Sequence, residues 1–538
     1  MKVNRKFLRS AERLSLSAIA KDSAAQRVVS AVTAIGFVLQ PVAALASTIT
    51  RTDGGPAVNF NNNVADVFAG KVVGDVAINK FAEFQLDANN IANMYFGMSE
   101  TSNSAANLVN FVDSRIDING TVNAIQNKKI DGNLFFFSSD GMAVGKTGVI
   151  NAGALYVATP TSTKFDEYKK LDNEDKFNTI IKDEGFAQIP INASGTISVL
   201  GKVNAVNAVN LRAAKIGVGK NVSGEAFDGV AADATVTEPG ASIRTGVVDF
   251  KDIVNVGNAN SGLTDDALIA EQTGSGDIVL AAYNNYNDNY SVTDDFSKIA
   301  GESVNAEVTV AQGAEVKAAG NAKLSAQALN NVLVEKSDQY KADYTPSTAT
   351  NSHLYGQIVT TDATVNVDGT VEAKQVDVTA DAVNRYVSAE SSVLNASNIT
   401  SNIVGALTAN LDASYAVLNS KAEVNVGQDA VINATGSDTV GSEGKVVKPA
   451  LNIKANSSVE AGAGASTALL KVMNVAGTNI IPAAAVTYSK TNNEAAVNID
   501  GTLKSKGGAS VTALADSKVN SEAKAPLWMF LKIPIWVM

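Results

Sequence analysis

Cysteine is absent from the chain, and histidine and tryptophan are rare: its 538 residues include one histidine, His353, and two tryptophans. The absence of cysteine excludes disulfide bonds, thiolate metal sites and cysteine nucleophiles. A single histidine excludes metal sites built from several histidines. Only 18% of the residues are charged, and the acidic residues are scattered rather than clustered. We therefore predict that the protein is not an enzyme and binds no cofactor.

Small and β-branched residues, with 41 glycines and many asparagines, make up most of the chain. Beyond about residue 110 they form short alternating segments separated by Gly, Asn-Gly or Asp-Gly. Alternation of apolar and polar residues predicts half-buried strands, and these turn residues favour tight connections. The sequence therefore predicts an all-β protein.

The N-terminus has the composition of a long secretion signal. Seven basic side chains precede the apolar segment Val28–Leu39, and Ala44 and Ala46 form a small-x-small cleavage site. We predict that residues 1–46 are a signal peptide cleaved after Ala46. An N-terminal membrane anchor is the alternative, but an apolar segment of 12 residues is short for a membrane span.

The mature chain would be strongly acidic. Residues 1–46 carry seven basic and two acidic side chains, so their removal lowers the formal net charge from −11 to −16. Contacts to phosphate groups need clustered lysine and arginine side chains. We therefore expect no nucleic acid among the partners.

The C-terminal half contains an internal repeat. The equivalent valines of four successive copies are Val308, Val365, Val424 and Val497. The intervals between them are 57, 59 and 73 residues, and the last interval includes a polar stretch of 14 residues, 436–449, with the composition of a loop. Without this stretch the period is close to 58 residues.

A fixed period of this length indicates a solenoid, in which each unit buries its apolar face against its neighbours. The best match is a right-handed parallel β-helix. Short strands, three to a circuit, would make a rung of about 20 residues, so we interpret one repeat as three rungs. An array of antiparallel hairpins is the alternative, but the glycine turns are not consistently the two-residue loops that such hairpins use.

Two stretches interrupt the strand pattern, and a third follows it. Residues 161–187 are highly charged, with large apolar residues at helical spacing, and predict a helical insertion on the flank of the stack. Residues 258–302 predict a second excursion. Residues 525–538 contain both tryptophans and a run of large apolar side chains. This tail is either a cap on the last rung or a frameshifted or truncated end.

Residues 141–147, with the sequence “GMAVGKT”, are superficially similar to a phosphate-binding loop. Three residues separate the two glycines where that motif needs four, and the residues that follow favour a strand rather than a helix. We therefore predict that Gly145, Lys146 and Thr147 form a turn between two strands, and we expect no bound nucleotide.

Residues from about Phe60 to Pro160 resemble the N-terminal secretion domain of two-partner-secreted exoproteins of the filamentous-haemagglutinin type. The resemblance lies in “INKFAEFQLDANNIANMYF” (Ile78–Phe96), “LVNFVDSRIDINGTVNAI” (Leu108–Ile125) and the layout of “LFFFSSDGMAVGKTGVINAGALYVATP” (Leu134–Pro160). The family has an Asn-Pro-Asn-Gly-Ile turn where this chain has Ser-Ser-Asp-Gly-Met. With this variant turn, the chain looks most like the leukotoxin-type filamentous adhesins.

The resemblance implies a division into a signal peptide at residues 1–46, a secretion domain at 47–160, a helical insertion at 161–187, β-helix repeats at 188–524 and an atypical tail at 525–538. It also implies a partner, an outer-membrane β-barrel transporter whose periplasmic domains recognise the unfolded secretion domain. The candidate recognition residues are Asn89, Asn90, Asn93, Ser138, Ser139, Asp140 and Gly141.

The function implied is that of a secreted filamentous adhesin at the surface of a Gram-negative-type bacterium. Its β-helical stalk would attach to host or neighbouring cells. The N-terminal part of a large leukotoxin or contact-dependent toxin of the same secretion class is the alternative, because that family includes toxins that carry their active part at the C-terminus.

Overall fold

The structure is a computed structural model that describes residues 47–235, 240–246, 269–290, 301–334, 352–388, 411–442, 445–466 and 484–524. The chain divides into two units, Met1–Ser47 and Thr48–Met538, and the second contains nearly all the described residues. The predicted signal peptide with Ala44 and Ala46, and the predicted tail at 525–538, lie outside the described residues.

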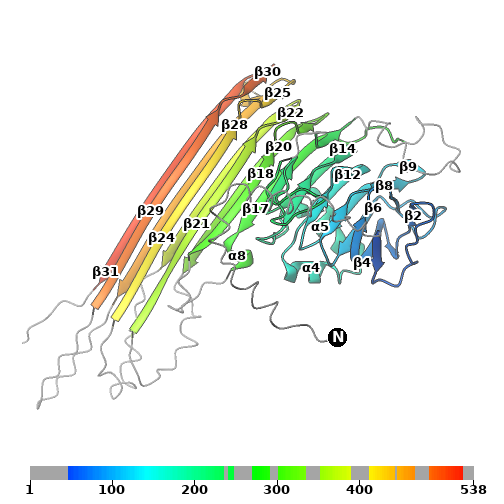
Figure 1. Cartoon of the computed structure of the whole chain (residues 1–538). Coiled ribbons are helices and arrows are strands. Elements are labelled where there is room, and N and C mark those ends of the chain that lie inside the picture. The colour runs from blue at the N-terminus through cyan, green and yellow to red at the C-terminus, as the bar shows by residue number, and fades with distance from the viewer. Residues whose placement is uncertain are drawn as a thin grey trace, which may run out of the picture. The chain divides into compact units, whose positions relative to one another are not determined.

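Stacked parallel strands on three faces form the unit Thr48–Met538, which confirms the predicted parallel β-helix (Figure 1). The described residues contain one sheet of 29 strands that winds around these faces. Each strand pairs in parallel with the strands one circuit before and after it, as β21 (Ser352–Val367) does with β18 (Glu302–Val310) and β24 (Leu411–Val426). The strands β4, β12 and β14 bend at a corner and contribute to two faces each.

The remaining strand bounds follow the stacking order on each face. The first face contains β2 (Val64–Val67), β5 (Ile91–Tyr95), β8 (Thr121–Gln126), β12 (Val149–Ala158), β14 (Lys202–Ala213), β16 (Ser242–Thr245), β19 (Glu315–Lys317), β22 (Thr370–Ala373), β25 (Val431–Ala434) and β30 (Thr502–Ser505). The second face contains β4 (Val76–Leu86), β6 (Asn107–Val112), β10 (Asn133–Phe137), the ends of β12 and β14, β17 (Asp277–Asn285), β20 (Ala322–Val334), β23 (Val376–Ser388), β28 (Leu451–Ser466) and β31 (Ala509–Lys524). The third face contains the end of β4, β7 (Ile116–Ile118), β11 (Met142–Val144), β13 (Thr196–Val199), β15 (Lys215–Val218), β18, β21, β24 and β29 (Ala484–Ile499).

The repeat valines stack directly on one another, so the predicted repeat is confirmed, but the interpretation of one repeat as three rungs is wrong. Val308 pairs with Val365, Val365 with Val424, and Val424 with Val497. One repeat is therefore one rung. Side chains that bond between adjacent rungs are 26 to 31 residues apart near the N-terminus and 57 to 59 residues apart in the later rungs.

Strand length explains the longer rungs. Strands of the third face grow from 3 residues in β7 and β11 to 16 residues in β21, β24 and β29. Along β24, Ala416, Leu418, Ala422 and Val424 are buried, and the residues between them are partly exposed. The second and third faces pack against each other, as β24 does against β28. The C-terminal half is therefore two flat layers with alanine and valine between them (Figure 1).

Antiparallel strands cover the N-terminal edge of the stack. Both β1 (Thr48–Arg51) and β3 (Lys71–Val73) pair with β4. The buried Arg51 guanidinium donates to the Asp53 carboxylate at 2.9 and 2.7 Å. Burial raises the pKa of Asp53, but hydrogen bonds from Arg51 and from the backbone amides of Lys80 and Gly55 outweigh it and lower the pKa. The pair therefore stabilises this edge above the pKa of an unfolded aspartate, and its contribution is lost as the pH falls below that range.

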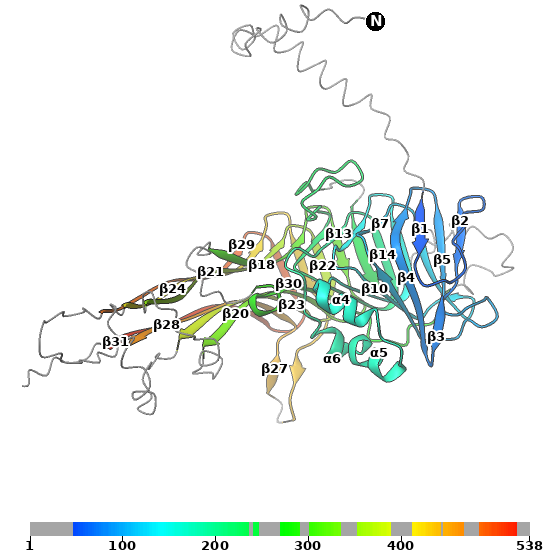
Figure 2. The same ribbon diagram turned by 90° about the horizontal axis from the view of Figure 1, so that it is seen from below.

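Three short helices confirm the predicted helical insertion at residues 161–187. They are α4 (Ser162–Tyr168), α5 (Glu174–Ile181) and α6 (Asp183–Phe186), on one flank of the stack (Figure 2). Their buried apolar side chains pack on the outer side of the second face, around Phe135 and Phe137. Phe135 stacks on Tyr156 with ring centroids 4.5 Å apart. The aromatic run in β10 follows from this cover, because both sides of the strand are buried.

The prediction of a second excursion at residues 258–302 is wrong for part of that range. Residues 277–285 form β17, which belongs to the stack and pairs with β14 and β20. A short helix, α8 (Tyr286–Asn289), follows it, and the Asn289 side-chain amide donates to the Ile191 carbonyl at 2.9 Å. Outside the three faces, β9 (Lys129–Ile130) pairs with β8, and β26 (Thr439–Val440) pairs with β27 (Val446–Lys448).

Glycines occupy the corner between the third and first faces on several rungs. They include Gly120, Gly148, Gly369 and Gly501, each directly before a strand of the first face. A Cβ on Gly120 would lie 2.2 Å from the Asn90 carbonyl oxygen, and one on Gly501 would lie 2.4 Å from the Gly427 carbonyl oxygen. Because successive rungs are only about 4.8 Å apart, a side chain at this corner would separate them.

We expect Gly369→Ala to destabilise the stack. The added methyl group would lie 2.4 and 2.5 Å from the carbonyl oxygens of Ala314 and Ala311, so the two rungs must shift apart locally. Overpacking of this kind costs about 1 to 3 kcal/mol in the free energy of unfolding, measurable by urea unfolding followed by circular dichroism. Gly301→Ala is the matched control, because its Cβ would meet only a methyl group of Ile358, at 3.3 Å. Equal losses in the two variants would contradict the role of the corner.

Candidate functional site

Residues 138–141 form the predicted turn, between β10 and β11. Ser138 is buried, and its hydroxyl donates to the Ser114 carbonyl at 2.7 Å and accepts from the Asp140 amide at 3.2 Å. Gly141 has a φ of 95°, and a Cβ there would lie 2.0 Å from the Thr196 carbonyl oxygen. Asp140 is the one exposed residue of the turn, and Ser139 is half-buried. The turn is therefore fixed on its inner side and presents a single carboxylate to solvent.

Asn89 and Asn90 lie in a second turn, between β4 and β5. Asn89 has a φ of 67°, which asparagine tolerates better than most residues, and its side chain is exposed. The Asn90 carbonyl accepts from the Thr121 amide of the next rung at 2.8 Å. In the folded chain this turn offers Asn89 to a partner, whereas the backbone of Asn90 is used in stacking.

Asn93, the third candidate asparagine, is part of a buried ladder of side-chain amides. The amides of Asn93, Asn123, Asn151 and Asn204 each donate to the side chain one rung before, over 2.9 to 3.1 Å, and Asp66 accepts from Asn93 at the first rung. All four asparagines are at most 1% exposed. The Asn93 side chain is therefore available to a partner only before the chain folds.

The two ends of this ladder have complementary charges. Every amide donates toward the N-terminal end, where the Asp66 carboxylate accepts. At the other end, the buried Asn204 Oδ1 has no hydrogen-bond partner among the described residues, and the next residue in register is Arg244, whose buried Nε also has none. An anion at the donor end and a cation at the acceptor end both favour the aligned amide dipoles.

The structure does not bring the candidate residues together. Asn89 and Asn90 lie at the corner between the third and first faces, and residues 138–141 lie at the corner between the second and third. Gly145, Lys146 and Thr147 form the predicted turn between β11 and β12, in which the Gly148 amide donates to the Gly145 carbonyl at 2.8 Å. A strand rather than a helix follows this turn, at Val149.

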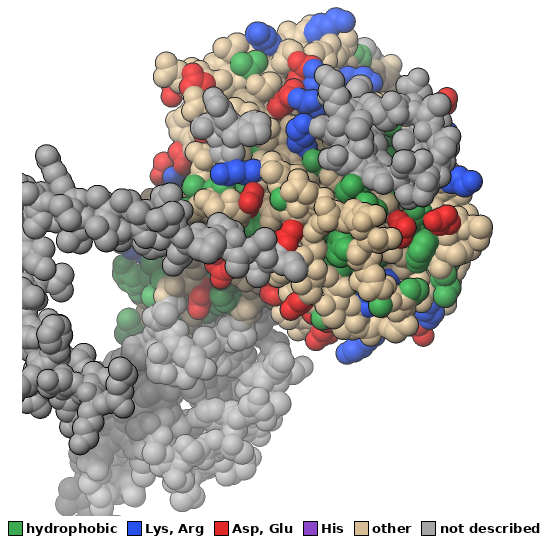
Figure 3. Space-filling view, turned by 45° about the vertical axis from the view of Figure 1, so that its right-hand side comes forward, with side chains coloured by type: hydrophobic (Ala, Val, Ile, Leu, Met, Phe, Trp, Pro, Cys, Tyr) green, Lys and Arg blue, Asp and Glu red, His purple; other side chains and the backbone are tan. Residues whose placement is uncertain are grey.

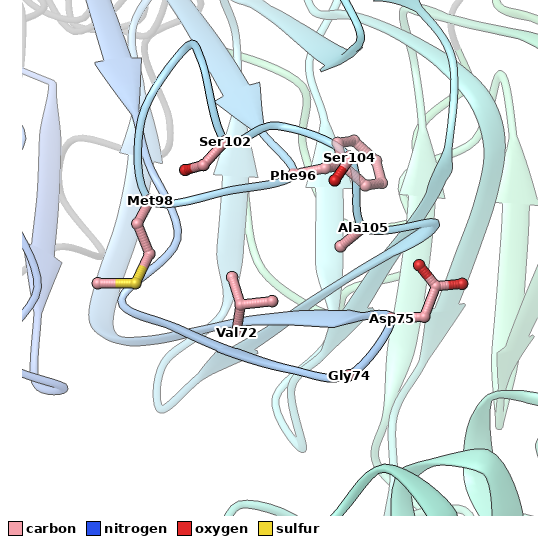
Figure 4. Close-up of a pocket in the computed structure, with 8 residues that line it drawn as sticks. All are labelled: Val72, Gly74, Asp75, Phe96, Met98, Ser102, Ser104 and Ala105. Atoms are coloured by element: carbon pink, nitrogen blue, oxygen red, sulfur yellow. The ribbon is translucent and has the colours of Figure 1, made fainter.

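A small pocket in the same N-terminal part was not predicted from the sequence. It has a volume of about 290 Å³ and lies between the β3–β4 connection and the segment from Phe96 to Ala105 (Figure 4). Phe96 is fully buried, whereas Met98 and Val72 are 57% and 37% exposed. Isolated apolar residues such as Val72 and Met98 give no recognisable signal in a sequence, since only the fold places them together. The pocket has room for one aliphatic side chain.

The surface of this part carries charges of both signs. Figure 3 shows lysine and arginine side chains interspersed with aspartate and glutamate among uncharged polar atoms. Within the described residues, no three histidine, cysteine, aspartate or glutamate side chains come together in a way that could hold a metal ion. A separate search of the same residues finds no helix long and apolar enough to cross a membrane.

We expect Asn123→Asp to destabilise the protein at neutral pH. One carboxylate oxygen would replace the amide that donates to Asn93 Oδ1 at 3.1 Å, so two acceptors would face each other in a buried site. The expected loss in the free energy of unfolding is about 3 kcal/mol. Burial raises the pKa of the introduced acid, so the loss is greatest above that pKa and is relieved as the pH falls.

Asn425→Asp is the matched control for the ladder. Asn425 donates to Asn366 at 3.0 Å and accepts from Asn498 at 2.8 Å, in the same geometry but at a partly exposed position. Urea unfolding between pH 4 and 8 should show a much smaller loss and little pH dependence. A similar loss in both variants would show that burial of the ladder is unimportant.

The chain was also compared with known proteins. Neither a protein-family model nor a curated protein matches its sequence. A proposal for its function therefore rests on the fold described above and on the resemblance of residues 60–160.

Proposed function

We propose that the chain is a secreted filamentous adhesin of a Gram-negative-type bacterium, exported through the outer membrane by a two-partner β-barrel transporter. The periplasmic domains of the transporter would bind the N-terminal part before it folds. Outside the cell, the β-helix would act as a stalk that attaches to host or neighbouring cells.

The observation that carries the proposal is the difference between the two edges of the stack. At the N-terminal edge, β1 and β3 pair antiparallel with β4 and close it. Every later rung pairs in parallel with the one before it. A new rung therefore completes its hydrogen bonds on a rung that precedes it in the chain. This order suits a chain that emerges from a transporter N-terminus first and folds as it emerges.

The candidate asparagines are consistent with recognition of an unfolded chain. Asn93 is at most 1% exposed once folded, and Ser138 is buried as well. A partner that reads these side chains must bind before the rungs stack. Folding would then release the partner, because it transfers the same amide and hydroxyl groups into hydrogen bonds within the stack.

The C-terminal half suits a stalk in an oxidising environment outside the cell. Its stability depends on stacking alone, since the chain has no cysteine that oxidation could alter. Polar ladders continue on its outer side, where Asn366, Asn425 and Asn498 bond from rung to rung. The long strands give this half an extended polar surface on which contacts to another cell can form.

Deletion of Gly132–Pro160 should leave the protein in the periplasm when it is co-expressed with the outer-membrane barrel of its own bacterium. This deletion removes β10, β11 and β12, and with them the turn that carries the family resemblance. The intact chain should reach the medium or the cell surface. Fractionation and immunoblotting measure the distribution.

A second deletion controls for the loss of one rung. Deletion of residues 365–423 joins Thr364 to Val424, and Val424 already stacks on Val365, so the register is kept. We expect export of this variant at close to the level of the intact chain. Equal export of the two deletion variants would contradict the proposal.

A further inference from the structure

The one repeat with extra residues carries a projecting hairpin. We call it the valine hairpin and define it as β26 (Thr439–Val440) and β27 (Val446–Lys448). It lies within the 14-residue stretch 436–449, at the corner between β25 and β28. Its two strands form a sheet of their own, separate from the large sheet, and extend away from the stack (Figure 2).

Valine side chains are exposed on both sides of this hairpin. Val440, Val446 and Val447 are 55%, 57% and 71% exposed. Val440 and Val446 are directly opposite each other and share one side. Val447 follows Val446 and therefore faces the other side, because successive residues of a strand alternate. A protein groove or sheet would cover one side only, whereas a lipid layer surrounds both.

The base of the hairpin is firmly attached to the stack. The Asp438 carboxylate accepts from the backbone amides of Ala450 and Gly508 at 2.9 and 2.6 Å. The Gln375 side-chain amide donates to the Thr439 hydroxyl at 2.8 Å. The exposed valines are thus held at a defined distance from the stack.

Lysines surround the base, although the whole chain carries a formal net charge of −11. Lys374, Lys445, Lys504 and Lys506 are all exposed. The Gly436 amide donates to the Lys374 carbonyl, and the Lys506 amide donates to the Ala434 carbonyl, so the rungs on either side of the hairpin carry these lysines. Of the described aspartates there, Asp377 pairs with Lys448 and Asp438 accepts two amides. Glu443 lies outside the described residues.

We propose that the valine hairpin binds to an anionic lipid bilayer, with its valines inserted among the acyl chains and the lysines at the headgroups. Apolar side chains partition into the interface, and lysines near an anionic surface add electrostatic attraction. The proposal is independent of the export route, because it concerns only the folded chain and a lipid surface.

A fluorescent label at the tip of the hairpin tests the insertion. Because the chain has no cysteine, Ser442→Cys gives a single site for an environment-sensitive dye next to the valines. With phosphatidylcholine vesicles that contain phosphatidylglycerol, we expect a blue shift and quenching by quenchers attached to the acyl chains. The same dye on Thr163→Cys, an exposed position on α4, should not respond. No response at Ser442 would overturn the proposal.

Substitutions separate the apolar and charged contributions to binding. Replacement of Val440, Val446 and Val447 by serine should weaken vesicle binding at least about tenfold, and Val486→Ser, on an equally exposed valine of β29, should not. Lys374→Glu with Lys506→Glu should weaken binding to anionic vesicles about tenfold. Circular dichroism should show an unchanged stack in every variant.

Three results would overturn the proposal. The first is unchanged vesicle binding by the triple-serine variant, and the second is equal binding to vesicles of phosphatidylcholine alone. The third is a blue shift at Ser442 that depends on protein concentration and needs no vesicles, because it would show that the hairpin pairs with a second copy of the chain.

Discussion

Parallel stacking in register is the constraint on which the rest of the structure depends. Backbone hydrogen bonds between rungs hold each residue about 4.8 Å from its equivalent one rung earlier. A residue type that fits at one rung therefore fits at the next. The column from Val308 to Val497, the asparagine ladder that begins at Asn93 and the corner glycines such as Gly369 are three results of the same geometry.

Buried polar side chains between the two flat layers make that register specific. Thr361 and Ser420, one rung apart, share a hydrogen bond of 3.1 Å, and the Asn384 amide crosses to the Asn419 carbonyl at 2.7 Å. Layers of alanine and valine alone can slip along one another at little cost. A slip that separates these polar groups leaves them buried without partners, which is costly. The polar groups therefore select one alignment of the layers.

The sequence was informative about register and uninformative about rung length. Recurrent valines reveal which residues stack, because stacking repeats residue types, so the repeat and the turn at residues 138–141 were predicted. The length of each strand was not, because small polar residues such as Ser420 interrupt the apolar pattern in the sequence but lie inside the layers. The burial of Asn93 had the same cause: an asparagine ladder has the composition of a turn, and only the fold shows that its amides face one another.

Insertions enter this fold at its corners. Helices α4 to α6 lie between the second and third faces, residues 219–241 between the third and first, and the valine hairpin between the first and second. A single residue added within a strand would move every later side chain of that strand to the opposite side. It would also break the pairing with two neighbouring rungs. A corner can lengthen at a cost that grows only slowly with length. Surfaces specialised for binding can therefore arise at the corners while the stacked faces keep the register.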